Sequence, residues 1–219
     1  MTNLNQQILK FDYDQNFKDQ DFYVSNSNEH SFSLLNSWPK WDKNFINLIG
    51  EKFSGKSHLI NIFLEKHRGI KINAEDINND FLQQIKIYEN IIEDLTEKIN
   101  ENLLFTLINI IDQDNKYLIV TSKIPIVDFK FKLNDLNSRS TNFILSQIEK
   151  PGDDLIYALI LKNLSDRQIS IDQKLIEFII KRIDRTYSKI SDFIYKIDEI
   201  SLKRKKPIDF KIIKEALEV

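Results

Sequence analysis

Short apolar runs alternate with helical patterns along the first two thirds of the chain. Each run is four to seven residues long, which is typical of a strand buried on both faces. Between the runs, apolar residues recur every three or four positions, as Leu103, Leu107 and Ile110 do, and this spacing is typical of an amphipathic helix. Strands that alternate with helices indicate βαβ units and a parallel sheet. The expected strands are residues 45–49, 70–73, 88–93, 116–122 and 143–148, and the expected helices between them are residues 57–67, 76–84 and 97–111.

The pattern changes at Pro151-Gly152, after which nearly every position fits a helix. Asp172 suits the start of the second of these helices, and Pro207 suits the first turn of the fourth. The predicted fold class is therefore α/β, with a parallel five-stranded sheet sandwiched by helices and followed by a small all-helical domain. The expected helices are residues 153–166, 172–183, 188–203 and 207–217, and the expected division of the chain is an N-terminal tail at 1–20, a core at 21–150 and the helical domain at 151–219.

Composition narrows the class of protein. The 219 residues are 42% hydrophobic, which excludes a wholly disordered chain, and they include no cysteine, which excludes a disulfide scaffold and a thiol nucleophile. The formal net charge of −2 at pH 7 disfavours binding to DNA through global charge. No apolar run approaches the ~18 residues that a membrane-spanning helix needs. The absence of cysteine suits a reducing cytoplasm, so we expect a cytoplasmic protein without a membrane partner.

A glycine-containing loop follows the first strong strand. Its sequence GEKFSGKS, residues 50–57, fits the phosphate-binding pattern G-x-x-x-x-G-K-[ST]. In such a loop the backbone N–H groups and the next helix's N-terminus face phosphate oxygens. Lys56 can then reach the β- and γ-phosphates, and the Ser57 hydroxyl can bind Mg²⁺. The alternatives are an ordinary strand–helix loop and a loop that no longer binds nucleotide. The nucleotide contacts expected here are Gly50, Ser54, Gly55, Lys56, Ser57 and His58.

An acidic pair ends the third apolar run, where Glu93 and Asp94 follow two isoleucines. Together with Ser57, these carboxylates are the candidate ligands for Mg²⁺ and can polarise an attacking water. The alternative is a solvated acidic pair that opens a helix. Glu93 stands where many P-loop ATPases have Asp, and the extra methylene works against tight Mg²⁺ geometry and fast hydrolysis.

At this point the chain resembles the AAA+ ATPases, and within them the DnaA/Hda branch of replication-initiation proteins. WPKWDKNFINLIGEKFSGKSHLI at 38–60 is similar to the family's Trp-Pro, strand and Walker A layout, and LLFTLIN at 103–109 resembles its helix after Walker B. The resemblance implies an AAA+ core, and it makes the helical tail a lid. LIVTSKIP at 118–125 resembles the sensor 1 strand, which places Thr121 or Ser122 near the γ-phosphate. A strand end with ordinary turn chemistry is the alternative.

Further matches to the family lie on both sides of the core. DFYVSNSNEHSFSLL at 21–35 resembles the segment that packs around adenine. LNDLNSRSTN at 133–142 resembles the box that carries an arginine finger, and KRIDRTYSKI at 181–190 resembles the start of the sensor 2 helix. The alternatives are apolar residues that close the core, and a loop arginine in a surface ion pair. The resemblance implies Phe22, Tyr23, Val24 and Asn28 near the base, Arg139 as the finger acting in trans, and Arg185 ahead of Arg182 as sensor 2.

The N-terminus carries the pattern Q-x-x-L-x-F at Gln6, Leu9 and Phe11. This pattern resembles the short motif by which Hda and other replication proteins dock on the sliding clamp of DNA polymerase III. Leu9 and Phe11 would fill apolar pockets while Gln6 makes polar contacts. A flexible tail, or packing of these side chains on the chain's own core, is the alternative.

The resemblance implies a regulator of replication initiation similar to Hda. DnaA initiators carry a helix-turn-helix domain, and the tail has 14 Lys/Arg against 12 Asp/Glu, so no direct sequence-specific DNA binding is expected. The protein would bind ADP or ATP with Mg²⁺, dock on the clamp and present Arg139 to ATP on the DnaA initiator. Its own ATPase would be weak, a homodimer is open, and it would associate with the nucleoid or replisome. The alternatives are an adaptor that uses nucleotide only structurally and a small P-loop phosphotransferase.

Overall fold

The computed structural model of the chain describes residues 22–85 and 89–218. The expected clamp-binding residues Gln6, Leu9 and Phe11 lie outside this part, so their role stays a prediction. Along the described ranges, none of the helices is both long and apolar enough to cross a bilayer.

Five strands form one sheet in the order β2-β3-β4-β1-β5, and each pair of neighbouring strands is parallel. The apolar runs form these strands because both faces of the sheet are covered. The predicted fold class is confirmed, and the strand boundaries differ from the expected ones by up to two residues. The strands are β1 (Phe45–Ile49), β2 (Gly69–Asn73), β3 (Glu89–Leu95), β4 (Leu118–Ser122) and β5 (Ile144–Gln147).

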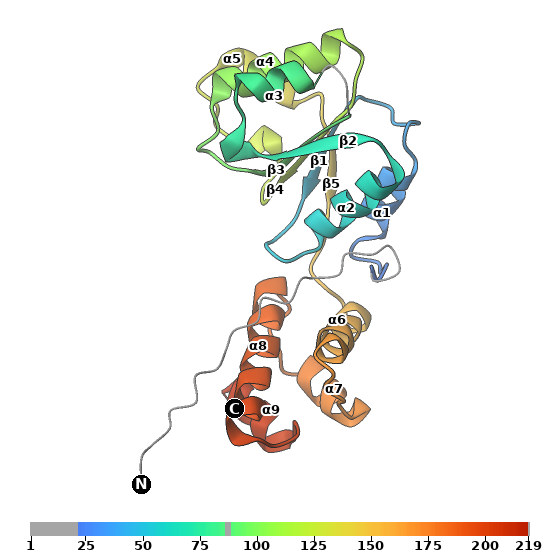
Figure 1. Cartoon of the computed structure of the whole chain (residues 1–219), viewed down its shortest axis with the longest axis vertical. Helices are drawn as coiled ribbons and strands as arrows, with labels where there is room; N and C mark the ends of the chain where they lie inside the picture. The colour runs from blue at the N-terminus through green and yellow to red at the C-terminus, as the bar shows by residue number, and fades with distance from the viewer. Residues whose placement is uncertain (1–21, 86–88, 219) are drawn as a thin grey trace.

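Helices cover both faces of the sheet. Helices α3, α4 and α5 lie on one face, and α1 and α2 lie on the other (Figure 1). Alternate residues of β1 serve the two layers, since Phe45 packs in the cluster with α4 while Ile46 and Leu48 pack with α2. The helices of the core are α1 (Glu29–Asn36), α2 (Lys56–Lys66), α3 (Asn79–Gln84), α4 (Glu101–Gln113) and α5 (Asn134–Ser140), with single 3-10 turns η2 (Ala74–Asp76) and η3 (Ile126–Asp128).

Side-chain caps set two of the helix starts differently from the sequence pattern. Asn78 Oδ1 accepts from Phe81 N at 2.9 Å, and Asn100 Oδ1 accepts from Leu103 N at 3.2 Å. These caps satisfy N–H groups that the helix itself leaves unpaired. The expected helix at 76–84 is therefore shortened to α3, and the one expected from residue 97 begins at Glu101.

The tail folds into four helices around a hydrophobic cluster of its own. Its helices are α6 (Asp153–Asp166), α7 (Gln173–Ile180), α8 (Tyr187–Arg204) and α9 (Phe210–Leu217). The expectation that Pro207 opens the last helix was wrong. Asp209 Oδ1 accepts from Ile212 N at 2.8 Å, and this cap starts α9 at Phe210 instead.

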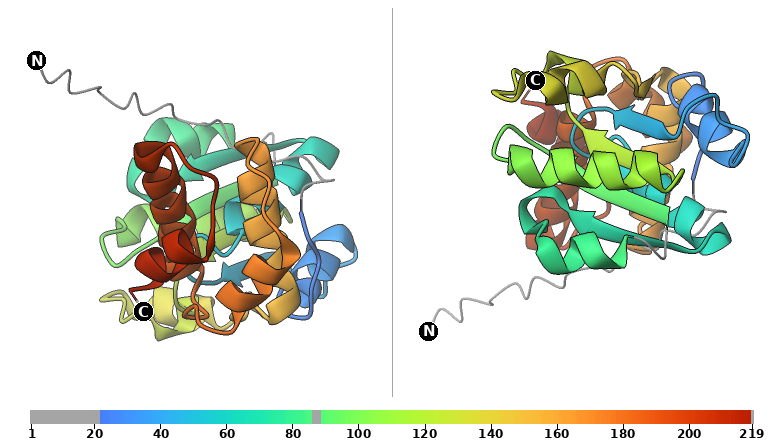
Figure 2. Two further views of the ribbon diagram at one scale, coloured as in Figure 1. Left: turned by 90° about the horizontal axis from the view of Figure 1, so that it is seen from below. Right: turned by 90° about the horizontal axis from the view of Figure 1, so that it is seen from above.

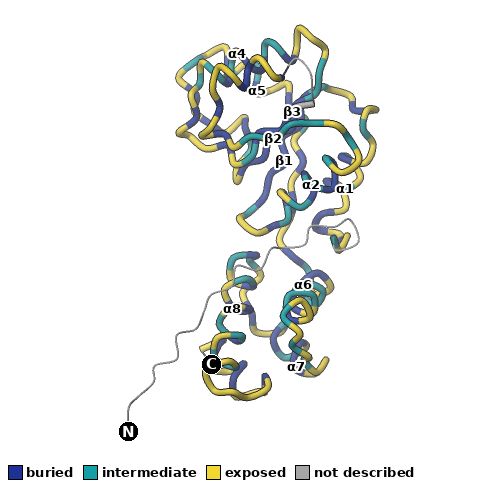
Figure 3. Tube along the Cα trace, viewed as in Figure 1, coloured by how far each residue is buried: buried dark blue, intermediate teal, exposed yellow. Residues whose placement is uncertain are grey.

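The tail lies beyond the sheet, next to the carboxyl ends of its strands. Viewed from below in Figure 2, α6–α9 stand in front of the sheet, whereas the view from above shows α3, α4 and α5. Figure 3 traces buried chain through the strands and exposed chain around the outer helices. Leu155 of α6 and Tyr187 of α8 pack in the same cluster as Ile46 of β1, so the two parts share a buried contact near the phosphate loop.

Candidate nucleotide-binding site

The loop 50–57 joins β1 to α2 and is tied to the end of β4. Gly50 N donates to Ser122 O at 3.1 Å, and Ser54 N donates to Glu51 O at 3.2 Å. A Cβ on Gly50 would lie 2.5 Å from Ser54 Oγ, and Gly55 has φ +95° at the N-cap of α2. Both positions therefore favour glycine. The loop places the N-terminus of α2 at the carboxyl end of β1.

Lys56 is buried at the centre of this loop, at 7% exposure. Its Nζ donates to Gly50 O at 2.8 Å and to Glu51 O at 2.9 Å. Burial lowers the pKa of Lys56, the nearby charge of Asp94 opposes that shift, Lys123 adds to it, and Glu93 opposes it. The structure thus brings the acidic pair of β3 within electrostatic reach of the loop lysine.

The other predicted loop contacts differ in their surroundings. Ser54 Oγ is buried and has no hydrogen-bond partner among the described residues. Ser57, the first-turn serine of α2, is exposed. The ring of His58 meets the ring of Phe22 edge to face, with centroids 5.2 Å apart. A phosphate oxygen is the kind of acceptor that the Ser54 hydroxyl lacks among the described residues.

Glu93 and Asp94 belong to β3 and do not open a helix. The pairing of β3 with β4 shifts between Ile92 and Leu95, and Asp94 takes a left-handed φ of +55° there. Asp94 N donates to Thr121 Oγ1 at 2.9 Å. This bulge interrupts the pairing of the acidic residues with β4, while Glu93 stays paired with Asn73 of β2.

Glu93 is already paired with a cation. Its Oε2 lies 3.2 Å from Nζ of Lys71 on β2, and its Oε1 is buried without a hydrogen-bond partner among the described residues. Mg²⁺ requires open oxygen ligands in near-octahedral geometry. Ser57 and Asp94 are exposed and meet that requirement, but Glu93 does not fit it as it lies. No group of three or more His, Asp or Glu side chains suited to a metal occurs in the described part of the chain.

The two candidate sensor 1 hydroxyls are both buried. Ser122 Oγ accepts from Asn47 Nδ2 at 2.8 Å and donates to Ile124 O at 2.6 Å. Thr121 Oγ1 accepts from Asp94 N, which leaves its own proton to donate. Thr121 is therefore the better placed of the two to act on a phosphate or a water.

The segment proposed to contact the base divides into a buried anchor and an exposed edge. Asn28 is 3% exposed, accepts from Ser25 N at 2.8 Å and donates to Tyr23 O at 3.0 Å. Asn28 therefore fits the alternative that this residue closes the core. Tyr23 and Val24 are 48% and 39% exposed, so they do not close the core and remain open to a ligand.

Arg185 lies on the tail directly before Thr186, the N-cap of α8. Its guanidinium is 2.6 Å from Asp153 Oδ1 at the start of α6. The next residue of α8, Tyr187, donates its N–H to Glu51 Oε2 of the phosphate loop at 3.3 Å. The Arg182 guanidinium instead stacks 3.7 Å from the centre of the Phe178 ring. Of the two arginines, Arg185 is the nearer in the chain to the residue that contacts the loop.

Arg139 is not brought to this site. It lies on α5, where a loop arginine was expected, and Leu136 of the same short helix is buried in the sheet cluster. Arg139 Nη1 is 3.1 Å from Asp112 Oδ2 of α4, and the two side chains are 33% and 53% exposed. The surface ion pair considered as the alternative is thus present on the face of the sheet opposite α2 (Figure 1).

Sequence reasoning missed two residues that the structure places at the site, Lys71 and Glu51. Lys71 interrupts the apolar run IKIN, and this charged residue within a run expected to form a strand was the available signal. Glu51 occupies a variable position of the loop pattern and carried no signal.

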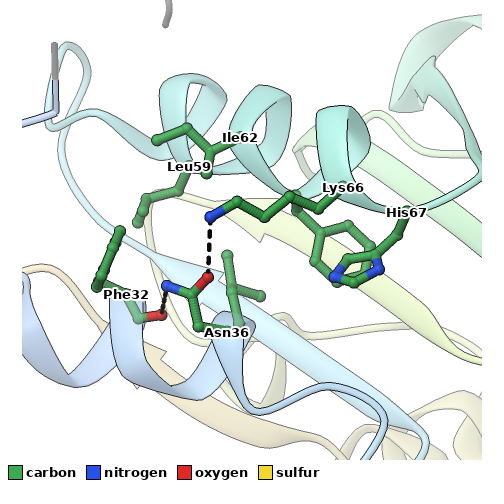
Figure 4. Close-up of a pocket in the computed structure, with 8 residues that line it drawn as sticks. Phe32, Asn36, Leu59, Ile62, Lys66 and His67 are labelled. Atoms are coloured by element: carbon green, nitrogen blue, oxygen red, sulfur yellow. Dashed lines mark hydrogen bonds between the residues drawn. The ribbon is translucent and has the colours of Figure 1, made fainter. Parts of the chain in front are cut away.

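A separate groove lies between α1 and α2, away from the loop lysine (Figure 4). It is lined by Phe32, Asn36, Leu59, Ile62 and Lys66, among others, and Lys66 Nζ donates to Asn36 Oδ1 across it at 3.3 Å. Its volume of about 10 Å³ holds roughly one water, so it is not a nucleotide site.

Known proteins share both sequence and fold with the chain, although no family model matches it. The chain is 27% identical over 154 residues to the chromosomal replication initiator protein DnaA of Borreliella afzelii. That match covers 59% of this chain and 32% of the relative, so the chain spans about a third of the relative's length.

Solved structures match nearly the whole chain. Domain III of the replication initiation protein DnaA of Thermotoga maritima has a TM-score of 0.74 at 16% identity, over 92% of this chain and 95% of that one. AMPPCP-bound DnaA from Aquifex aeolicus has a TM-score of 0.67 at 18% identity, over 85% of this chain and 67% of that one. A RuvB mutant from Thermotoga maritima has a TM-score of 0.69 at 14% identity, over 90% of this chain and 71% of that one. The chain therefore has a DnaA-like AAA+ fold.

Proposed function

We propose that the chain binds an adenine nucleotide at the loop 50–57 and acts in the regulation of replication initiation. One observation carries the first part of this proposal. The Lys56 ammonium is buried at the N-terminus of α2 and held by two loop carbonyls at 2.8 and 2.9 Å. Bound phosphates would offer stronger, charged acceptors at the same place. The similar DnaA of Aquifex aeolicus binds AMPPCP, which supports a nucleotide as the ligand.

The surrounding residues supply the other contacts. Tyr23 and Val24 face solvent near the loop and are available to the base, and Thr121 can donate to the terminal phosphate. Arg185 needs to leave Asp153 to reach a phosphate, and an exposed ion pair costs little to open. ADP and ATP are both candidates. Mg²⁺ stays a prediction at Ser57 and Asp94, since Glu93 fits it poorly.

The finer proposal is a role similar to that of Hda. Arg139 would stabilise the charge on ATP held by a DnaA initiator. It lies on α5, on the opposite face of the sheet from α2, so we expect it to meet a second protein and not the chain's own loop. Its pair with Asp112 is solvent-exposed and is worth about 0–1 kcal/mol. The guanidinium can therefore exchange Asp112 for a phosphate without a large loss.

Docking on the sliding clamp completes this proposal. It is supported by the pattern at Gln6, Leu9 and Phe11, and it would place the protein at the replisome. A variant with these three residues changed to alanine should lose binding to the clamp from the same cell. Unchanged binding would remove the motif from the mechanism.

The decisive test measures ATP hydrolysis by the initiator from the same cell in the presence of the chain, clamp and DNA. We expect Arg139→Ala to abolish stimulation and Arg182→Ala, a matched arginine stacked on its own tail, to retain it. Full stimulation by Arg139→Ala would show that the arginine finger assignment is wrong.

A second function is an adaptor in which nucleotide is only a structural ligand. The pairing of Glu93 with Lys71 favours it, because a carboxylate held by an ammonium group is poorly placed to support turnover. Normal partner binding and initiator regulation by a Lys56→Ala variant that no longer binds nucleotide would support the adaptor over the nucleotide-dependent regulator.

A further inference from the structure

We propose that Lys71 is a built-in cation of the nucleotide site, so that the chain does not require a divalent metal to bind nucleotide. The inference deepens the proposed function and rests on its nucleotide-binding part. Lys71 Nζ lies 3.2 Å from Glu93 Oε2 and 3.1 Å from Asn61 Oδ1. One ammonium group thus joins the edge strand β2 to β3 and α2.

The position of this ammonium follows from the helix that begins at the loop. Asn61 comes four residues after Ser57 on α2, and residues four apart lie on the same helix face about one turn from each other. Ser57 is the hydroxyl that a metal would use in a phosphate loop. The Lys71 ammonium therefore lies about one helical turn from that position.

Glu93 is closed to a metal by its surroundings as well as by its partner. The side chain is 16% exposed, and Oε1 is buried without a hydrogen-bond partner among the described residues. A hydrated Mg²⁺ keeps several waters, and solvent does not reach Oε1 as the side chain lies. A metal at Glu93 would also have to displace or approach the ammonium of Lys71, which carries the same sign of charge.

Several cations lie near the loop before any metal binds. The pKa of Lys56 responds to Asp94, Glu93 and Lys123, so these groups lie within its electrostatic reach. Lys71 adds a third ammonium group, beside Lys56 and Lys123, to this set of charges through its ion pair with Glu93. Where Mg²⁺ usually supplies positive charge beside the phosphates, this chain supplies it from β2 and from the end of β4.

The test is a titration of the intact chain with ADP, in buffer with Mg²⁺ and in buffer with EDTA. For the natural sequence we expect the two dissociation constants to agree within about threefold. Lys71→Met should bind ADP in Mg²⁺ but lose about tenfold or more in EDTA. Lys71→Arg keeps the charge and should stay insensitive to EDTA. Lys98→Met, an exposed lysine elsewhere, is the matched control.

Each outcome of this titration supports or overturns the inference about Lys71. A loss of tenfold or more in EDTA by the natural chain would overturn the inference while leaving the proposed function intact. EDTA-insensitive binding by Lys71→Met, with its fold checked by circular dichroism, would equally overturn it. Absence of ADP binding by the natural chain in both buffers would instead overturn the proposed function, and this inference with it.

Discussion

Lys56 and Arg139 are the two cations on which the proposed mechanism depends, and they have opposite surroundings. Lys56 is 7% exposed, is fixed by two carbonyls and lies where the loop after β1 enters α2. Arg139 lies on a short outer helix, in an ion pair whose members are 33% and 53% exposed. The first site is built before its ligand arrives, while the second is held in place weakly and can change partner.

The difference teaches which role each group can play. A buried and fixed lysine suits tight binding of a ligand that stays with the protein, because little reorganisation is needed. An exposed arginine suits a transient contact with a second protein, because leaving its ion pair costs little. Changes at the loop should therefore alter nucleotide affinity, whereas changes on α5 should alter only the effect on a partner.

The largest expected effect is at the loop lysine. Lys56→Ala removes the ammonium that faces the phosphates and should weaken ADP binding by about 100-fold or more. Lys52→Ala, an exposed loop lysine near the Phe53 ring, is the control and should change affinity by less than about threefold. Isothermal titration calorimetry distinguishes the two. Equal losses in both variants would contradict a special role for Lys56.

A backbone change in the loop should have the next largest effect. The Cβ of Gly50→Ala would meet Ser54 Oγ at 2.5 Å, and relieving such overpacking typically costs about 1–3 kcal/mol. We expect about tenfold weaker ADP binding and a lower melting temperature. The control is Gly152→Ala, whose Cβ meets the mobile end of Asp154 at 2.9 Å. If both glycines tolerate alanine equally, the loop is less constrained than described.

The contact between core and tail gives a pH-dependent effect. Burial raises the pKa of Tyr187 to about 12, a hydrogen bond with Ser27 opposes the shift, and Glu51 and Glu149 add to it. The phenol also donates to Glu149 O at 3.0 Å. Because the folded pKa is above the unfolded value of 10.0, this stabilisation is complete below pH 10 and is lost as pH rises toward 12.

Tyr187→Phe tests that contribution. At pH 8 the variant should be less stable than the natural chain by about 1 kcal/mol, the usual value of one hydrogen bond. Chemical denaturation repeated between pH 8 and pH 11 should show the difference shrinking as pH rises. A difference that grows with pH would reverse the assigned direction of the pKa shift.

The smallest expected effects are those of substitutions on α4 and α5 on the chain's own stability and ADP affinity. Arg139→Ala and Asp112→Asn should each change the free energy of unfolding by less than about 1 kcal/mol and leave ADP affinity unchanged. Asp112→Asn frees the guanidinium, so it should maintain or raise stimulation of the initiator, in contrast to Arg139→Ala. A loss of the chain's own ADP binding in Arg139→Ala would break the comparison with Lys56.

The sequence was most informative where burial is symmetrical or a motif has fixed spacing. The strand Phe45–Ile49 and the helix Asp153–Asp166 match their expected boundaries, because long apolar patterns define them. The short helices α1 and α5 were not predicted. In α5 only Leu136 is a buried apolar residue, which leaves no periodicity to read. The start of α9 depends on one aspartate cap, and it outweighed the signal from Pro207.

The site shows the same limit. Glycine and lysine spacing located the loop, and the acidic pair on β3 was found from the strand before it. The partner of Glu93 could not be predicted, because Lys71 reaches it from a neighbouring strand that is distant in the chain. The exposure of Tyr23 and Val24, as opposed to the burial of Asn28, likewise depends on how the segment folds against the core.

The junction at Pro151-Gly152 bears on how the sheet and the helical tail can be exchanged during evolution. In the described residues the backbone passes from the sheet to the tail once, between β5 and α6. A tail attached at one point can be exchanged by recombination without rethreading the sheet. Residues 1–150 and 151–219 expressed as separate polypeptides should copurify through Leu155, Tyr187 and Glu51. Gene fission between residues 150 and 151 would then leave the loop 50–57 in one product and helices α6–α9 in the other.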